Sequence, residues 1–80
     1  MPLVVSVDEA GALYLDQNRA TDLEVRARAR AARAADPQAS AVLAADARAR
    51  HESVVHALDL LRGERVVKIA IVVRGSERRP

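Results

Sequence analysis

The spacing of apolar residues predicts a β-hairpin at the start of the chain. Leu3, Val5 and Val7 recur at every second position, which is the period of a β-strand. Gly11 lies in the polar segment that follows, and glycine adopts the positive φ of a hairpin turn at little cost. Residues 12–15 are therefore predicted to return as the second strand.

A second turn is predicted at residues 16–18, followed by a helix from Thr21 to about Ala35. Thr21 and Glu24 have the spacing of a capping box, in which each side chain bonds the backbone amide of the other residue. Pro37 ends the helix, because proline disfavours helical geometry at the residue before it. The helix carries an apolar stripe of Val25, Ala29 and Ala32 and a basic stripe of Arg26, Arg30 and Arg33.

The second half of the chain predicts a strand, a helix and a strand. Residues 40–45 are an uncharged apolar run, which is typical of a buried strand. A helix is predicted from about His51 to Leu61, and a strand over residues 66–73, with a disordered tail at 74–80. The apolar face of the helix is expected to hold Val54, Val55, Leu58 and Leu61.

These elements follow the order β-β-α-β-α-β, which is an α+β fold. The hairpin is antiparallel, whereas strand–helix–strand units favour parallel pairing. We therefore expect one domain over residues 1–73, with a mixed sheet and both helices on one face. The second face of the last strand is nearly as apolar as the first, which suits a central strand or an edge strand that binds a partner.

The amino-acid composition limits the kinds of functional site that the chain can form. The chain has 80 residues, a net charge of +2, no cysteine and a single aromatic residue, Tyr14. Cysteine-bound zinc and disulfides are excluded. His51 and His56 are five residues apart, so they do not form a two-histidine metal face on one helix. With no glycine-rich phosphate loop and no convergent acid–base pair, we expect neither an enzyme nor a cofactor.

Two features have alternative interpretations. Asp46 follows a strand, where a functional acid could lie, but a turn acid that accepts from nearby amides is the favoured interpretation. The arginines at 26–30 suggest a small basic nucleic-acid-binding α+β domain as the alternative function. Single-strand recognition usually needs stacking aromatics, so nucleic acid is not the favoured partner.

Several short motifs occur together in order. They are Val5-Ser6-Val7-Asp8, Gly11 and Leu13-Tyr14-Leu15 in the hairpin, Thr21, Glu24 and Val25 at the helix start, Asp36-Pro37 at its end, Ala45-Asp46, Val54-Val55, Leu58 and Asp59, and Lys68, Ile69, Ile71 and Val72. From about Val5 to Val73 the chain thus resembles the periplasmic domain of the ExbD/TolR family. It departs from that pattern at Arg65, where the family usually has glycine, and at residues 50–52.

The resemblance implies a domain of a biopolymer transport complex driven by the proton motive force. Such proteins have an N-terminal inner-membrane helix that bears a proton-carrying aspartate, expected to lie outside this chain. The implied partners are a second copy of the chain, an ExbB/TolQ-like channel, a TonB/TolA-like transducer and, in TolR-like members, peptidoglycan. The implied location of this domain is the periplasm.

The last strand is the expected partner or dimer edge. An apolar strand with free backbone groups can pair with another strand by β-augmentation. A proline at Ala70 is expected to abolish that pairing if the amide of Ala70 takes part in it. The family motif Ala45-Asp46 is expected to be structural. The residues of the predicted edge are Val66, Val67, Lys68, Ile69, Ala70, Ile71, Val72 and Val73.

Overall fold

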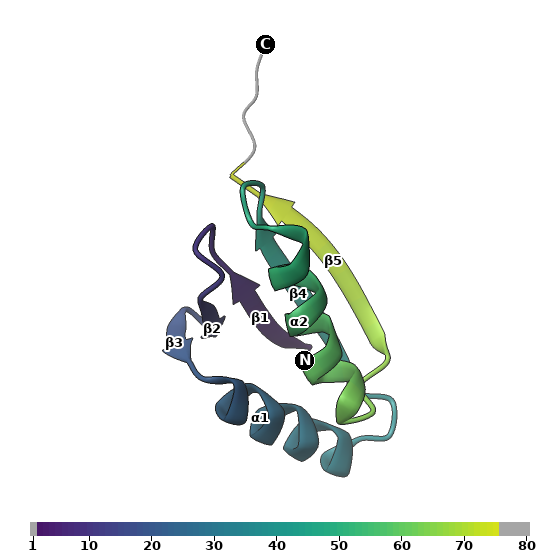
Figure 1. Cartoon of the computed structure of the whole chain (residues 1–80). Helices are drawn as coiled ribbons and strands as arrows, with labels where there is room; N and C mark the ends of the chain where they lie inside the picture. Colours follow the sequence, from purple (N-terminus) through teal and green to yellow (C-terminus); the bar gives the residue numbers. More distant parts are fainter. Residues whose placement is uncertain (1, 76–80) are drawn as a thin grey trace.

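A computed structural model describes residues 2–75 and confirms the α+β class (Figure 1). The predicted order of strands and helices is present, with one additional short strand after the first hairpin. The elements are β1 (Leu3–Val7), β2 (Leu13–Leu15), β3 (Asn18–Ala20), α1 (Asp22–Ala35), β4 (Ser40–Asp46), α2 (His51–Gly63) and β5 (Lys68–Arg74).

The five strands form one mixed sheet in the order β3-β2-β1-β4-β5. β2 pairs antiparallel with both β1 and β3. β4 lies parallel to β1 on one side and to β5 on the other. The predicted parallel pairing through a helical crossover is therefore confirmed for β4 and β5, which α2 connects. The strand before α1 was predicted to be residues 12–15, but β2 runs antiparallel to β4, because β3 reverses the chain before the helix and β4 pairs with β1 instead. β3 and β5 are the two edges of the sheet.

The additional strand β3 follows a two-residue turn. Asp16 and Gln17 have φ values of 49° and 75°, and Leu15 pairs with Asn18 across the turn. Positive φ at both central residues matches the twist of an antiparallel hairpin. The polar turn was predicted from the sequence, but Asn18-Arg19-Ala20 lacks the apolar alternation that would have indicated a strand.

Helix α1 begins and ends where the sequence predicts. The Oγ1 of Thr21 accepts from the Glu24 amide at 3.2 Å, and the Glu24 carboxylate accepts from the Thr21 amide at 2.8 Å. At the other end, the Asp36 amide donates to the carbonyl of Ala32 at 3.0 Å. Val25 and Ala29 of the predicted apolar stripe are fully buried.

Helix α2 turns three of the four residues of its predicted apolar face toward the core, namely Val54, Leu58 and Leu61. Ala57, Leu60 and Leu61 are buried, whereas Val54 and Leu58 are half-buried. Val55 remains 37% exposed, so its assignment to the apolar face was wrong. The buried face also includes Ala57 and Leu60, because α2 packs against α1 on its flank as well as against the sheet.

The hydrophobic core lies between one sheet face and the two helices, which cover the same face (Figure 1). Leu3, Val5 and Val7 of β1 point into it, together with Leu43 of β4. The residues that alternate with them point to the opposite side, which no helix covers. We call that side the open face; it includes Val4, Ser6, Tyr14, Val42, Ala44, Ala70 and Val72.

The last strand starts two residues later than predicted. The Val66 amide donates to the Leu61 carbonyl at 3.1 Å, and Arg65 has a φ of 68°. A bond of this kind across a left-handed residue is the Schellman ending of a helix. Val66 is therefore buried in the helix ending rather than lying in β5. β5 continues to Arg74, one residue beyond the predicted strand. Of the predicted tail, residues 76–80 lie outside the described residues.

Candidate functional site

The free edge of β5 is the first candidate site. The Arg74 carbonyl accepts from the Ala47 amide at 2.7 Å, so the backbone groups of Arg74 face β4. The direction of these groups alternates along a strand. Ala70 and Val72 therefore face β4 as well, and the amides and carbonyls of Ile69, Ile71 and Val73 point out of the sheet.

The side chains of this edge are largely exposed and aliphatic. Ile71 is 53% exposed and Val73 61% exposed, both on the side of the helices, and Val72 is exposed on the open face. Helix α2 packs on β1 and β4, and of the helix-side residues in β5 only Ile69 is half-buried against the core. β5 is thus aliphatic toward the helices, carries Ala70 and Val72 on the open face, and is unpaired along one side.

Val66 and Val67 were also predicted to belong to this edge. Val66 is fully buried in the helix ending, so it is not available there. Val67 precedes the strand and is 72% exposed. The structure therefore brings together Lys68, Ile69, Ala70, Ile71, Val72 and Val73 of the predicted set, and it adds Arg74.

Two cations mark the ends of the edge. Lys68 and Arg74 are six residues apart and lie on the open face, because they pair in register with Ser40 and Asp46 of β4. The ammonium of Lys68 donates to the side-chain carbonyl of Gln38. Within residues 2–75, neither cation is in an ion pair, and β5 itself contains no acid.

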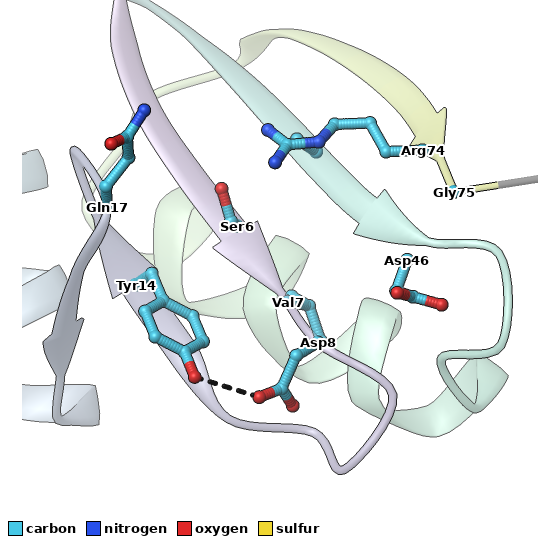
Figure 2. Close-up of a pocket in the computed structure, with 9 residues that line it drawn as sticks. Ser6, Val7, Asp8, Tyr14, Gln17, Asp46, Arg74 and Gly75 are labelled. Carbon is cyan, nitrogen blue, oxygen red and sulfur yellow. Dashed lines mark hydrogen bonds between the residues drawn. The ribbon is translucent and has the colours of Figure 1, made fainter.

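The open face also carries a pocket of about 360 Å³ at the carboxyl ends of β1 and β4. Figure 2 shows the Arg74 side chain extending over this face toward Ser6, whereas the Asp46 carboxylate points away from it. The pocket is lined by Ser6, Val7, Asp8, Tyr14, Gln17, Ala44, Asp46, Arg74 and Gly75.

The carboxylate of Asp8, which lines this pocket, accepts its hydrogen bonds from residues of the first hairpin. One carboxylate oxygen accepts from the amides of Ala10 and Ala12 at 2.9 and 2.8 Å, and the other accepts from the Tyr14 hydroxyl at 3.0 Å. The bond from the Ala12 amide is the main cause that lowers the pKa of Asp8, although partial desolvation opposes it. The hydrogen bond to Asp8 also raises the pKa of Tyr14. A carboxylate held by three donors organises a turn; it is not poised to take a proton.

The motif Ala45-Asp46 lies at the end of β4. Ala45 is buried, and one oxygen of Asp46 accepts from the Arg48 amide at 2.8 Å. That contact closes a turn two residues long, which is a common structural use of aspartate. The two acids that line the pocket, Asp8 and Asp46, therefore both hold backbone turns.

The described residues offer no metal centre. Within residues 2–75, no three His, Cys, Asp or Glu side chains are grouped to hold an ion. His56 instead contacts Asp22 at 2.7 Å and joins α2 to α1, while His51 is the first residue of α2. No helix in this range combines the length and the apolar character needed to cross a membrane.

The arginines of α1 are partly engaged within the fold. The guanidinium of Arg30 binds the Glu64 carboxylate with two hydrogen bonds of 2.9 and 3.2 Å. Arg28 pairs with Asp16 at 3.0 Å. These contacts tie the helix to neighbouring turns, which gives the alternating arginines a role in the fold without any nucleic acid.

Sequence reasoning identified β5 but not the Asp8–Tyr14 pair. Tyr14 lies opposite Ser6 on the open face, so its hydroxyl reaches the turn after β1. The available signal was the alternation of Tyr14 with Leu13 and Leu15, which places the ring on the face away from the core.

A comparison with protein families supplies the context for this site. The family described as "Biopolymer transport protein ExbD/TolR" matches residues 1–76, which is nearly the whole chain. This is a transport-associated family rather than a family of enzymes. A comparison with curated proteins gave no match.

Proposed function

The chain belongs to the ExbD/TolR family of biopolymer transport proteins, and we propose that it is the periplasmic partner-binding domain of a proton-driven energy-transducing complex. The complex is of the TonB–ExbB–ExbD or Tol–Pal type. In this proposal the domain binds a TonB- or TolA-like transducer, forms a homodimer and, in the TolR-like case, contacts peptidoglycan. An ExbB/TolQ-like channel is engaged by an inner-membrane helix that belongs to the full-length protein.

The observation that carries the proposal is the difference between the two sheet edges. β3 has three residues and includes Asn18 and Arg19, so it is short and polar, as protected edges are. β5 has seven residues, and Ile71 and Val73 are more than half exposed. A long, apolar, unpaired edge is a site for strand addition.

The proposed working contact is thus backbone pairing at β5. Ile69, Ile71 and Val73 direct their amides and carbonyls outward, which offers three donors and three acceptors to an incoming strand. Main-chain bonds supply affinity in this binding mode, and the alternate side chains supply specificity. No proton transfer is assigned to the described residues, because Asp8 and Asp46 both accept from backbone amides.

The experiment is a proline substitution at the centre of the edge. Ile71→Pro removes an outward amide and is expected to abolish binding to the TonB- or TolA-like transducer while leaving the pairing with β4 intact. Ile71→Ala is the matched control, because it shortens the side chain and keeps the amide; it is expected to weaken binding only in part. Binding of Ile71→Pro at the strength of Ile71→Ala contradicts the proposal.

The register changes the use of the substitution at Ala70. The Ala70 amide faces β4, so Ala70→Pro breaks the internal pairing of the sheet and tests stability. The sequence could not reveal this, because the direction of each amide depends on the register between β4 and β5.

A further inference from the structure

We infer that the free edge of β5 selects an extended partner segment with a carboxylate at each end and aliphatic residues between, in preference to a second copy of β5. This inference rests on the proposed strand addition and specifies the chemistry of the added strand. It follows from three features of the edge: the direction of its amides, the aliphatic side chains toward the helices, and the two terminal cations.

The preference for aliphatic residues in the partner comes from the side chains of β5 that lie on the side of the helices. Ile69, Ile71 and Val73 align with Ala41, Leu43 and Ala45 of β4. Ala41 and Leu43 belong to the hydrophobic core, and Ala45 is buried on the same side of the sheet. Residues directly opposite on an added strand point to the same face as their neighbours. Aliphatic residues at alternate positions of the partner would therefore cover Ile71 and Val73, which are now more than half exposed.

The preference for carboxylates at the ends of the partner comes from the two cations on the open face. Lys68 and Arg74 stand at the two ends of β5, with only Ala70 and Val72 between them on that face. In the free domain both side chains lie over the sheet, Lys68 against Gln38 and Arg74 toward Ser6, so they turn toward the edge when a partner carboxylate pairs with them. Oppositely charged residues directly across two strands attract, and like charges repel. A partner with acids six residues apart would place one carboxylate opposite Lys68 and the other opposite Arg74.

The same cations disfavour a second copy on this edge. Two β5 strands that pair antiparallel about a twofold axis at Ile71 overlap over all seven residues. In that register Lys68 of each copy lies opposite Arg74 of the other, which makes two like-charge pairs. Lysine on an exposed edge is also a known device against self-pairing. We therefore expect any dimer of this domain to use a surface other than the full β5 edge.

The test uses two blocked synthetic heptapeptides with the domain labelled for NMR. One has the sequence Glu-Val-Ser-Val-Ser-Val-Glu, and the other has lysine in place of both glutamates. The pattern is symmetric, so it presents the same groups in parallel and antiparallel orientation. Binding is followed through the amide signals of Ile69, Ile71 and Val73, which report on the outward edge.

The expected result is an exchange of preference on charge reversal. The native domain should bind the glutamate peptide about tenfold more tightly than the lysine peptide, given two cross-strand charge pairs. The K68E/R74E domain should prefer the lysine peptide. The K68Q/R74Q domain, in which the charges are removed without reversal, should bind both equally and serves as the matched control.

Three results would overturn the inference. Equal binding of both peptides to the native domain, with shifts at the three outward amides, removes the charge code and leaves strand addition standing. Shifts at those amides with rising concentration of the domain alone would mean that a second copy takes the edge. If neither peptide shifts the amide signals of Ile69, Ile71 and Val73, the proposed selection of the partner segment is wrong. The Ile71→Pro comparison then decides separately whether the edge binds the transducer.

Discussion

At the residue scale, Asp8 organises the polar contacts at the carboxyl end of β1. Its carboxylate accepts from Ala10, Ala12 and Tyr14, and it thereby connects the turn after β1 to the returning strand β2. The arrangement is local in sequence, because all four residues lie within seven positions of the chain. It fixes the hairpin that forms one wall of the open-face pocket.

Asp8→Asn is expected to bring the pKa of Tyr14 back toward the usual value for tyrosine of about 10. The pKa is raised in the native protein mainly because the hydroxyl donates to a charged carboxylate, and asparagine removes that charge. Tyr14 is the only aromatic residue, so its titration can be followed by ultraviolet absorbance without interference. An unchanged Tyr14 titration in Asp8→Asn would contradict the assigned contact.

Asp8→Asn should also change how the stability of the protein depends on pH. The pKa of Asp8 is lowered in the folded state, so its contribution is present above the ordinary aspartate value of about 3.9 and is lost as pH falls through the lowered value. The native protein should exceed Asp8→Asn in stability at neutral pH. The difference in urea midpoint should shrink in acid; a difference that persists at the lowest pH would argue against this assignment.

Gly11 is required by the backbone of the first turn. Its φ is +87°, and a Cβ built there would lie 2.9 Å from the Oγ of Ser53 in α2. Gly11→Ala is therefore expected to lower the free energy of unfolding by about 1–2 kcal/mol. Gly63→Ala is the control: nothing lies within 4 Å of its Cβ position, and alanine in a helix should stabilise by about 0.5–1 kcal/mol. Urea unfolding of both variants measures this, and equal effects would contradict it.

At the element scale, the elements with local determinants were predicted most accurately. The capping box of α1 depends on residues three positions apart, so Thr21 and Glu24 could be recognised from sequence alone. The buried face of α2 depends on where α1 packs, which sequence periodicity does not contain. The start of β5 was misplaced because the helix ending uses Arg65 in a conformation that usually indicates glycine.

Arg65→Gly is expected to stabilise the protein by about 0.5–1 kcal/mol. Arg65 has a φ of 68°, and a left-handed conformation costs a side-chain-bearing residue about 1–2 kcal/mol, partly offset by the greater freedom of glycine when unfolded. Arg62→Gly, in the last turn of α2 and three residues before Arg65, is the matched comparison and should destabilise by about 0.5 kcal/mol. Thermal unfolding of the pair measures both signs; destabilisation by Arg65→Gly would refute the proposed strain.

At the scale of the whole molecule, the sheet is asymmetric. One edge, β3, is short and polar, and the other, β5, is long, aliphatic and flanked by cations. The sequence predicted that the last strand was either central or a partner edge, and only the strand order decided between them. Which amides face outward also required the register with β4, so this part of the candidate site could not be predicted from residues alone.

The central claim is that the outward backbone of β5 receives the partner strand. Amide hydrogen exchange, measured on the domain alone and with its TonB- or TolA-like transducer bound, tests this claim most directly. Ala70 and Val72 face β4 and should be protected in both states, whereas Ile69, Ile71 and Val73 should become protected only in the complex. Exchange at those three amides that stays as fast in the complex as in the free domain would contradict the account.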